Sequence, residues 1–389
     1  MLKSIKLSNL LSFGAETEIV FNKGLNVLIG ANGSGKSNLI EAISLLQAMP
    51  KDLTKAIRDG GGIEEWLWKG DKNHQATLEV ILDNLHDSMP LRHIFEFRAS
   101  NYTVEVTKES LENKDKRSKD RHSKPYIFYE YNGRKATVNR TEKTRQKELH
   151  LENIETYQSI LAQRQDPDAY PEITGVANNY QKIRIYREWQ FGRYTLPRTP
   201  QRADLPNNFL EENSSNLGLI LSSFKRTSEI KKKLLDALKL FSESIEDFDV
   251  IVEGGYVQIF FEENGFTIPA TRLSDGTLRY LSLLAILLHP NPPPLICIEE
   301  PELGLHPDVL PSLIELLKEA GEKTQVIITT HSADLIDALT DMPEAVLVFD
   351  KQQGSTTVNR LNKEDLKDWL NDYSLGQLWR RGDIGGNRW

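Results

Sequence analysis

The stretch Gly30-Ala31-Asn32-Gly33-Ser34-Gly35-Lys36-Ser37 decides the fold that this sequence predicts, because it fits the pattern G-x-x-x-x-G-K-[ST] at every fixed position. The run Gly24–Ile29 before it predicts a short buried strand, and Ser37–Met49 after it has apolar side chains at helical spacing. Glycines between a strand and a helix let backbone N–H groups converge on phosphate oxygens, and the helix N-terminus adds a positive partial charge. The simpler alternative is a glycine-rich turn that contains a lysine by chance, and the flanking elements argue against it.

This loop also predicts which groups bind a nucleotide and its metal ion. The Lys36 ammonium can reach β- and γ-phosphates, and the Ser37 hydroxyl can ligate Mg²⁺. The other loop residues supply backbone N–H groups. The predicted nucleotide site consists of Gly30, Asn32, Gly33, Ser34, Gly35, Lys36 and Ser37.

The composition is that of a globular protein with room for two or three domains, or for one domain with insertions. The chain has 389 residues, of which 39% are hydrophobic and 27% charged, and its net charge of −8 argues against a nucleic-acid coat protein. Basic residues nevertheless outnumber acidic ones between residues 108 and 147. The run Lys108–Lys124 contains a single apolar residue, so it predicts a mobile loop. A solvated loop is the simpler interpretation, and contact with a polyanion such as DNA is the alternative.

Cysteine content and hydropathy indicate where the protein works. Cys297 is the only cysteine, so an intrachain disulfide is impossible and a reducing compartment is expected. The N-terminus has no apolar signal-peptide core, and the longest apolar run, Leu281–Leu288, is too short to span a bilayer. We expect a cytoplasmic protein without membrane contact.

Apolar strands alternate with helices at both ends of the chain and predict an α/β fold with a mostly parallel sheet. Period-two segments between residues 76 and 140 predict a lateral antiparallel β block, and residues 141–165 are expected to be helical. The expected divisions are residues 1–75 with the phosphate loop, 76–180 with the β block, basic loop and helical insertion, 181–265 with a core strand and a helical lobe, 266–350 with the rest of the core, and 351–389 as a C-terminal tail.

The run Leu295–Glu300 is a hydrophobic strand that ends in two acids. A strand tip beside a phosphate loop is where a nucleotide-bound Mg²⁺ and its attacking water need carboxylates. We therefore predict that Glu299 acts on the metal, directly or through water, and that Glu300 orients or deprotonates water. A solvent-exposed strand end is the structural alternative.

The run Leu273–Thr277 precedes a long apolar helix, and it offers a second helix N-terminus to a phosphate. The donors would be the Ser274 hydroxyl and the Gly276 N–H. Ordinary helix capping explains much of this pattern on its own.

Three further polar residues are candidates for the same site. His331 follows the buried strand Gln325–Thr329 and could hydrogen-bond a γ-phosphate, although a lone histidine is more often structural. Gln190, or alternatively Gln75, could reach Mg²⁺ or the attacking water. The other histidines form no Cys/His cluster, so a zinc site is improbable.

Residues 361–389 combine Leu375–Arg381 with several glycines and a terminal Trp389. Trp and Arg are typical interface anchors, so we expect this tail to dock a partner protein. A frayed terminus is the alternative.

These motifs, in this order, resemble the ABC-type ATPase heads of the SMC, RecF and OLD (overcoming-lysogenization-defect) families. Gly30–Ser37 looks like the Walker A loop of a P-loop NTPase, with Asn38 following as in the pattern GxNGSGKSN. Leu273–Thr277 resembles the ABC signature, Leu295–Glu300 Walker B, Glu302–Pro307 the D-loop, and His331 the switch histidine. The resemblance covers residues 1–50 and 265–350.

The resemblance implies an ATPase that uses ATP and Mg²⁺ and works as a homodimer or higher homo-oligomer. Two ATP molecules would be sandwiched head to tail between two copies, with Asn38 added to the ATP-binding residues and Ser274 and Gly276 acting in trans. The implied catalytic residues are Glu300, His331 and Lys36. The implied metal ligands are Ser37, Glu299 and Gln190.

The sequence also departs from the pattern of these families. Glu299 stands where Walker B usually has aspartate, which puts direct metal ligation in doubt, and the run Glu299–Glu302 is closer to OLD proteins than to SMC proteins. SMC-type coiled-coil arms are not expected, and about forty residues after Phe349 leave too little room for a Toprim nuclease domain. A nuclease or toxin effector would therefore be a separate polypeptide.

Three hypotheses follow. The first is an ATP-switched regulator in anti-phage defence or genome maintenance that controls such an effector in trans. The second is a RecF-like DNA-repair ATPase that clamps DNA itself through Lys108–Lys124. The third is a scaffold in which nucleotide is only structural.

Overall fold

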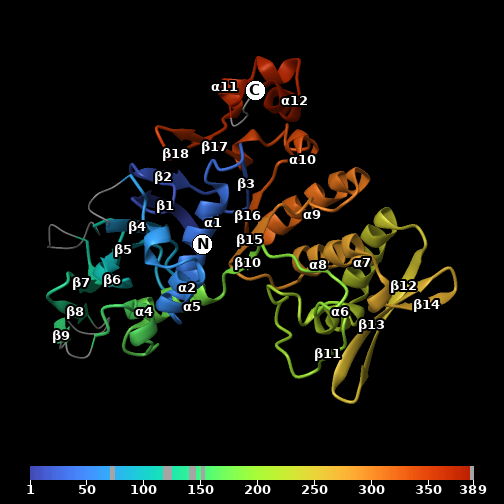
Figure 1. The fold of residues 1–389 in the computed structure, drawn as a ribbon, viewed down its shortest axis with the longest axis horizontal. Helices are drawn as coiled ribbons and strands as arrows, with labels where there is room; N and C mark the ends of the chain where they lie inside the picture. Colours follow the sequence, from blue (N-terminus) through green and yellow to red (C-terminus); the bar gives the residue numbers. More distant parts are fainter. Residues whose placement is uncertain (71–74, 117–124, 140–145, 150–153, 386–389) are drawn as a thin grey trace.

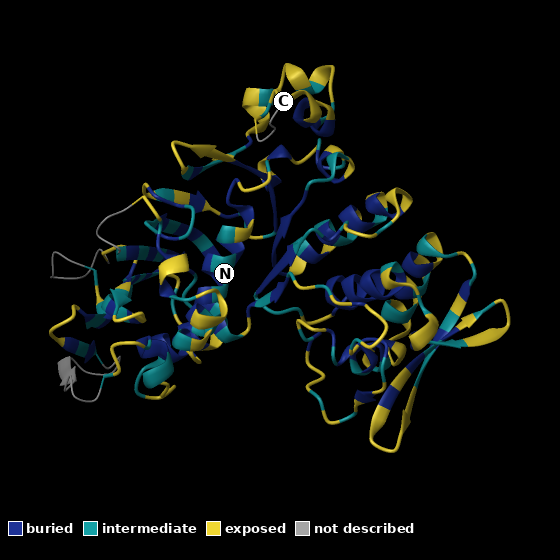
Figure 2. Ribbon diagram, in the orientation of Figure 1, coloured by how far each residue is buried: buried dark blue, intermediate teal, exposed yellow. Residues whose placement is uncertain are grey.

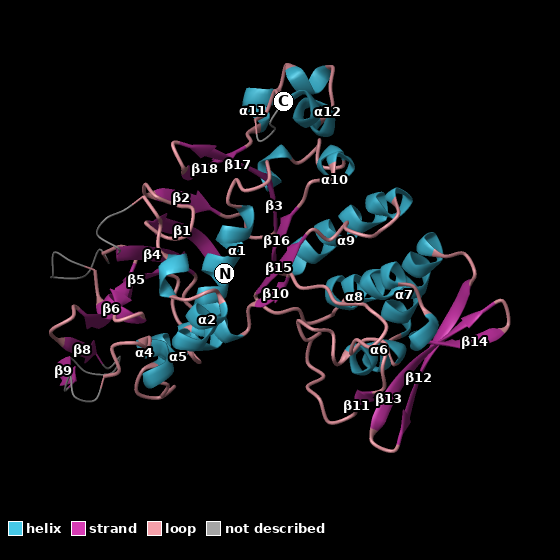
Figure 3. Cartoon of the chain, viewed as in Figure 1, coloured by secondary structure: helices cyan, strands magenta, loops and turns pink. Residues whose placement is uncertain are grey.

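A six-stranded sheet forms the centre of the molecule in the computed structural model, which describes residues 1–70, 75–116, 125–139, 146–149 and 154–385 (Figures 1 and 3). Five neighbouring strands are parallel, and the sixth, β18, pairs antiparallel with β17 at one edge. The strand order is β10 (Arg184–Tyr186), β15 (Leu295–Glu299), β16 (Gln325–Thr329), β3 (Leu25–Gly30), β17 (Val346–Gln352) and β18 (Ser355–Arg360). The predicted α/β class with a mostly parallel core sheet is confirmed.

This sheet separates two hydrophobic cores (Figure 2). Along β15, Leu295 and Cys297 point into the first core, whereas Ile296 and Ile298 point into the second. Because successive side chains of a strand point to opposite faces, a strand buried on both faces must be apolar throughout. That requirement explains the uninterrupted apolar runs in the sequence.

The first core lies between the sheet and an antiparallel sheet of eight strands. Helices α1 (Lys36–Ala48), α2 (Leu53–Asp59), α3 (Ile63–Trp66), α4 (Ile160–Gln163) and α5 (Pro171–Gln181) also contribute to it. The strands run in the order β2 (Thr17–Val20), β1 (Leu2–Ser8), β4 (Gln75–Leu82), β5 (Leu91–Ser100), β6 (Thr103–Asn113), β7 (Ile127–Tyr131), β8 (Ala136–Asn139) and β9 (Gln146–Leu149).

The second core is covered by helix α9 (Leu310–Lys323) and by a lobe that the chain forms between β10 and β15 and that ends with helix α8 (Asp275–Leu287). We call residues 187–294 the second lobe; it lies on the right in Figure 1. It contains α6 (Leu217–Lys225), α7 (Ser228–Phe241), β11 (Gln201–Arg202), β12 (Ile245–Glu253), β13 (Tyr256–Glu263) and β14 (Phe266–Pro269). Short 3-10 turns occur at Ala270–Arg272, Pro307–Val309, Pro343–Ala345 and Trp369–Asn371.

The expected helix at residues 141–165 is wrong in the part that the structure describes. Residues Gln146–Leu149 form β9, and only Ile160–Gln163 is helical, while 140–145 and 150–153 lie outside the described residues. The helix that packs there is α5, which begins at Pro171. Proline favours the first turn of a helix, because its missing N–H would have no partner there, so Pro171 is suited to start α5.

The expected loop over Lys108–Lys124 is wrong for its first part, because β6 continues to Asn113. Glu109 is buried there and accepts hydrogen bonds from Ser159 Oγ at 2.6 Å and from Ile160 N at 2.8 Å. A buried polar side chain with such partners is tolerated in a strand, which charge counting does not reveal. Residues 117–124, the most basic part of the run, lie outside the described residues.

Within the tail that we expect to dock a partner, Leu375–Arg381 forms helix α12, so the alternative of a frayed terminus is wrong for these residues. This helix packs against α10 (Ala333–Asp337), where Leu375 and Leu378 are fully buried and Trp379 is 8% exposed. A short helix, α11 (Lys363–Leu366), precedes it. The anchors that we assigned to a partner are therefore used within the chain, and Trp389 lies outside the described residues. Among the described residues, no helix is both long enough and apolar enough to cross a membrane.

Candidate functional site

The phosphate loop joins β3 to α1 as the sequence predicts. Gly30 has φ +150° and Gly35 has φ +110°, backbone conformations that residues other than glycine rarely adopt. A Cβ on Gly30 would lie 2.3 Å from the Phe349 carbonyl oxygen, and one on Gly35 would lie 2.2 Å from Thr356 Oγ1. Both positions therefore need glycine because of backbone conformation and because the neighbouring strands β17 and β18 approach closely.

Lys36 folds back over this loop. Its Nζ donates to the carbonyl oxygens of Gly30 at 2.8 Å and Ala31 at 3.2 Å. Burial lowers the pKa of Lys36 to about 8, while the negative charges of Glu300 and Glu299 act in the opposite direction. The loop is thus already shaped, and it holds a partly desolvated cation that an anion can bind.

The acidic strand end meets the phosphate loop. Ser37 Oγ donates to Glu299 Oε2 at 2.8 Å, although β16 lies between β3 and β15 in the sheet. Burial raises the pKa of Glu299, and its hydrogen bond to Ser37 opposes that shift. Two oxygen ligands that meet beside a phosphate loop, one of them a desolvated carboxylate, fit the chemistry that Mg²⁺ prefers.

Glu300 has an unusual backbone. Its φ is +45°, in the left-handed region, where a residue other than glycine carries a cost of order 1 kcal/mol. The conformation is held by Glu300 N, which donates to the Thr329 carbonyl at 3.1 Å, and by Arg279 Nη2, which donates to the Glu300 carbonyl at 2.7 Å. An observed outlier of this kind is typical of a functional position.

His331 lies beside Glu300, with Nε2 4.0 Å from Glu300 Oε1. Burial lowers the pKa of His331, and the positive charge of Lys36 lowers it further. The imidazole is therefore biased toward its neutral form, which can both donate and accept a hydrogen bond.

Glu302 is a site residue to which the sequence analysis gave no role of its own. Its Oε1 accepts from Thr330 Oγ1 at 2.5 Å and from His331 N at 3.0 Å, and burial raises its pKa. Glu302 thus connects the chain after β15 with the backbone of the histidine after β16. The signals in the sequence were its position two residues after the acid pair and at the start of the segment that resembles the D-loop.

Ser274 is the N-cap of α8, and its Oγ accepts from Thr277 N at 3.0 Å. Arg198 Nη1 donates to the Leu273 carbonyl, and Arg198 Nη2 pairs with Asp275. No hydrogen bond joins Ser274 or Gly276 to residues 30–38, a range that the structure describes throughout. The two helix N-termini therefore do not act on each other within one chain.

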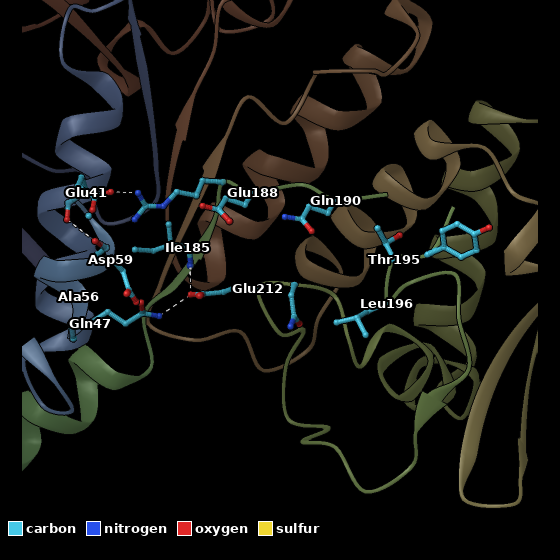
Figure 4. A pocket seen from close by; sticks show the side chains of 16 residues that line it. Glu41, Gln47, Ala56, Asp59, Ile185, Glu188, Gln190, Thr195, Leu196 and Glu212 are labelled. Carbon is cyan, nitrogen blue, oxygen red and sulfur yellow. Dashed lines mark hydrogen bonds and ion pairs between the residues drawn. The ribbon is translucent and has the colours of Figure 1, made fainter. Parts of the chain in front are cut away.

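The two glutamine candidates lie in different places. Gln75 starts β4, and its Nε2 donates to Glu96 Oε2 at 2.9 Å within the antiparallel sheet. Gln190 lines a cleft of about 660 Å³ between α1 and the start of the second lobe. Figure 4 shows Glu188 and Gln190 on one wall of this cleft and Glu41 and Gln47 on the other. Neither Ser37 nor Glu299 lines this cleft, so the metal-binding role of Gln190 stays a prediction.

The segment that leaves β10 contains two further residues that sequence reasoning missed. Arg187 pairs with Glu41, which is one helical turn after Ser37 on α1. Trp189 Nε1 donates to the Glu299 carbonyl at 3.3 Å, and the Arg279 guanidinium lies 5.0 Å from the centre of the Trp189 ring. These residues connect the phosphate-loop helix, the acidic strand and α8, and no local sequence pattern marks them.

Part of the chain is similar in sequence to curated proteins. The chromosome partition protein Smc of Mycobacterium tuberculosis is 31% identical over 115 residues, which cover 26% of this chain and 9% of that protein. The DNA replication and repair protein RecF of Pediococcus pentosaceus is 31% identical over 113 residues, which cover 27% of this chain and 29% of that protein. The chain thus matches less than a tenth of the length of the Smc relative.

Two solved structures share the fold over nearly the whole chain. A crystal structure of an Smc head bound to the C-terminal winged-helix domain of ScpA has a TM-score of 0.56 at 16% identity, covering 94% of this chain and 99% of that one. The Smc head of Pyrococcus furiosus, with an extended coiled coil and bound to the C-terminal domain of ScpA, has a TM-score of 0.58 at 14% identity, covering 95% and 98%.

The family model described as "AAA domain, putative AbiEii toxin, Type IV TA system" matches residues 25–337, a range that begins at β3 and ends with α10. That range contains the phosphate loop, α8, the acidic strand and His331. The chain therefore belongs to this AAA-domain family, and its fold is that of an ABC-type ATPase head of the SMC and RecF kind.

Proposed function

We propose that this protein binds and hydrolyses ATP between two copies of itself and uses the cycle as a switch that controls a separate protein. One observation carries the proposal: the chain has two helix N-termini suited to phosphate, at α1 and α8, and they do not meet within one copy. If a second copy presents its Ser274 and Gly276 to the nucleotide bound by residues 30–38 of the first, both helix N-termini contact phosphate.

In this proposal the phosphate loop holds the β- and γ-phosphates. Lys36 exchanges its two carbonyl partners, Gly30 and Ala31, for phosphate oxygens. Ser37 and Glu299 would hold Mg²⁺, with Gln190 as a further candidate ligand, and the ion would neutralise charge on the phosphates. Glu299 would act on the metal directly or through a bound water.

Glu300 is the proposed base that orients and deprotonates the attacking water. The contacts of Thr329 and Arg279 fix its backbone, so the carboxylate is presented at the strand tip. His331 would hydrogen-bond the γ-phosphate, and loss of that phosphate would be transmitted through its backbone to Glu302. Nucleotide that contacts both copies favours the closed pair, and hydrolysis removes that preference.

Phosphate release by Glu300→Gln protein tests the enzymatic part. We expect the rate to fall by about 10²–10⁴-fold, as for loss of a general base, while ATP binding measured by calorimetry persists. Wild-type protein that releases no phosphate but binds ATP would leave the structural-scaffold hypothesis in place.

Ser274 variants test the contact in trans. Ser274→Asp keeps an N-cap side chain but adds a negative charge that repels a γ-phosphate, whereas Ser274→Ala loses the cap at a cost of about 1 kcal/mol and adds no charge. We expect light scattering to show an ATP-dependent dimer for Glu300→Gln protein and none for Glu300→Gln/Ser274→Asp protein. An undiminished dimer in the double variant would contradict the arrangement, and Ser274→Ala in the same background separates the effect of charge from that of capping.

The controlled partner is proposed to be an effector such as a nuclease or toxin in anti-phage defence or genome maintenance. The family description, which names a toxin and a toxin–antitoxin system, supports this class of role. Its test is a purified candidate effector encoded beside this protein, whose activity should change when ATP is replaced by ADP. An effector indifferent to the nucleotide state would contradict the switch.

A RecF-like DNA clamp is the second candidate, and the match to a DNA replication and repair protein favours it. It predicts that Glu300→Gln protein binds duplex DNA only with ATP, and that affinity falls steeply between 50 and 200 mM salt. Replacing the lysines of the run Lys108–Lys124 by glutamine should abolish that binding while ATP affinity is unchanged. DNA binding that ignores ATP and these lysines would exclude the clamp.

A further inference from the structure

The phosphate loop is supported from outside by strand β18, which lies beyond the range that the family model matches. Thr356, on β18, is fully buried, and its Oγ1 lies 2.8 Å from the Ser34 carbonyl oxygen and 2.7 Å from Ser12 Oγ. The Thr356 hydroxyl has one hydrogen and two acceptors within reach, the Ser34 carbonyl and the Ser12 hydroxyl, and its donation to Ser34 joins β18 to the phosphate loop. Thr356 thus lies within hydrogen-bond distance of both the phosphate loop and the segment that contains Ser12.

The orientation of one peptide group follows from this contact. The carbonyl of Ser34 and the N–H of Gly35 belong to the same trans peptide, so they point in opposite directions. Holding that carbonyl toward β18 turns the Gly35 N–H toward the inside of the loop. No acceptor in the described part of the chain takes this N–H, which leaves it for an anion.

The segment that presents Ser12 is itself held in an unusual shape. Leu11 has φ +54°, a conformation that costs a residue other than glycine of order 1 kcal/mol. The backbone of Ser12 is fixed to β18, because Thr356 N donates to the Ser12 carbonyl at 2.8 Å. Gly14 N donates to Ser355 Oγ at 2.9 Å and adds a second connection. Residues far apart in the sequence thus meet on the outer side of the phosphate loop.

We infer that Thr356 is a positioning residue for nucleotide binding: its hydroxyl fixes the Ser34–Gly35 peptide so that the Gly35 N–H faces the phosphates. The inference rests on the proposed ATP binding. It assigns to the β17–β18 hairpin a part in the nucleotide site, although Thr356 touches neither nucleotide nor metal in this arrangement.

The test compares the affinity of the full chain for ATP and ADP, with Mg²⁺, between wild type and Thr356→Val. Valine keeps the shape and burial of the side chain but lacks the hydroxyl. We expect both affinities to fall by about three- to tenfold, the value of one hydrogen bond, and kcat to change by less than about twofold because Thr356 does not contact Glu300. A residue that only stabilises the fold would leave the affinities of the folded protein unchanged, and circular dichroism verifies that each variant is folded.

Two controls make the result decisive. Thr357→Val changes the neighbouring residue of β18, whose hydroxyl lies 3.5 Å from the Asp350 carbonyl, and should leave ATP affinity as in wild type. Thr356→Ser retains the hydroxyl and should bind ATP within about twofold of wild type. If Thr356→Val does not fold, Thr356→Ala and Thr356→Ser form the matched pair, since both lack the methyl group and only alanine lacks the hydroxyl.

The outcomes separate this inference from the function on which it rests. Wild-type protein that binds no ATP would overturn the proposed function. Wild type that binds ATP, together with folded Thr356→Val or Thr356→Ala protein that binds it equally well, would overturn the inference alone. A loss of affinity in Thr357→Val as large as in Thr356→Val would overturn it too.

Discussion

Lys36 shows how burial at a single residue sets the conditions for binding. Phosphates bind its protonated form, and burial lowers its pKa to about 8 in the free protein. Above that pH the free protein must take up a proton when nucleotide binds, so ATP affinity should fall as pH rises, approaching tenfold per pH unit. Titrations at pH 7.5, 8.5 and 9.5 measure this, since the phosphates of ATP no longer change charge there. Lys36→Met should bind weakly and without this dependence, and a flat wild-type profile would contradict the assignment.

Glu299 offers a second test at the scale of one residue. Its carboxylate is desolvated and lies against Ser37, so it attracts Mg²⁺ but repels phosphate when the metal is absent. Glu299→Gln should therefore raise the Mg²⁺ concentration needed for tight ATP binding by roughly tenfold. Without Mg²⁺, the same variant should bind ATP at least as tightly as wild type. Equal Mg²⁺ requirements in the two proteins would show that Glu299 does not act on the metal.

Among the elements, α8 connects the two parts of the proposed composite site. Ser274 caps its first turn, and Arg279 on the same helix holds the Glu300 carbonyl and lies over the Trp189 ring. A movement of α8 would therefore displace the contact that holds the backbone of Glu300, the proposed base.

Arg279→Gln removes the charge and the cation–π contact of this helix. We expect kcat for ATP hydrolysis to fall by roughly tenfold, because Glu300 loses a contact that holds its strained backbone, while ATP affinity changes little. Steady-state rates and equilibrium titration separate the two quantities. Arg279→Lys should recover part of the rate, and a variant whose affinity falls as much as its kcat would indicate a different role.

The strands of the parallel sheet, which are buried on both faces, were the elements most readily predicted. The strand predicted at Gln325–Thr329 has the bounds of β16, because a short apolar run bounded by polar residues fits a central strand. Helix α5 was not predicted, and strand β9 was missed because the polarity of residues 141–149 does not indicate a strand. Their formation depends on long-range partners that local patterns do not encode.

The candidate site likewise contains residues that local sequence patterns predict and residues that they do not. The phosphate loop, the acid pair and His331 follow chain-local patterns, and the structure brings them together. Glu302, Trp189 and Arg279 come from separate segments of the chain, and each contacts the site only through tertiary packing. A sequence cannot show that α10 already covers the apolar side chains of Leu375–Arg381, and partner docking by this tail stays a prediction.

At the scale of the whole molecule, the proposal requires two copies with two equivalent composite sites. Lys36→Ala should inactivate the phosphate loop of its own copy, and Ser274→Asp should inactivate only the site whose nucleotide its partner holds. Each variant alone should be inactive, but an equal mixture contains mixed pairs with one intact site. Each mixed pair has one intact site out of two, so phosphate release should recover to at most about half of the wild-type rate. A mixture as inactive as its components would show that Lys36 and Ser274 serve the same copy.

The division of the interior by one parallel sheet has a consequence for how the protein melts. Strands β3, β15 and β16 contribute alternate side chains to both hydrophobic cores, so neither core can be lost without exposing the other. We therefore expect the two halves of the molecule, one on each side of the sheet, to unfold together on heating, although the chain is long enough for separate domains. A scanning calorimeter should record a single endotherm whose calorimetric and van't Hoff enthalpies agree.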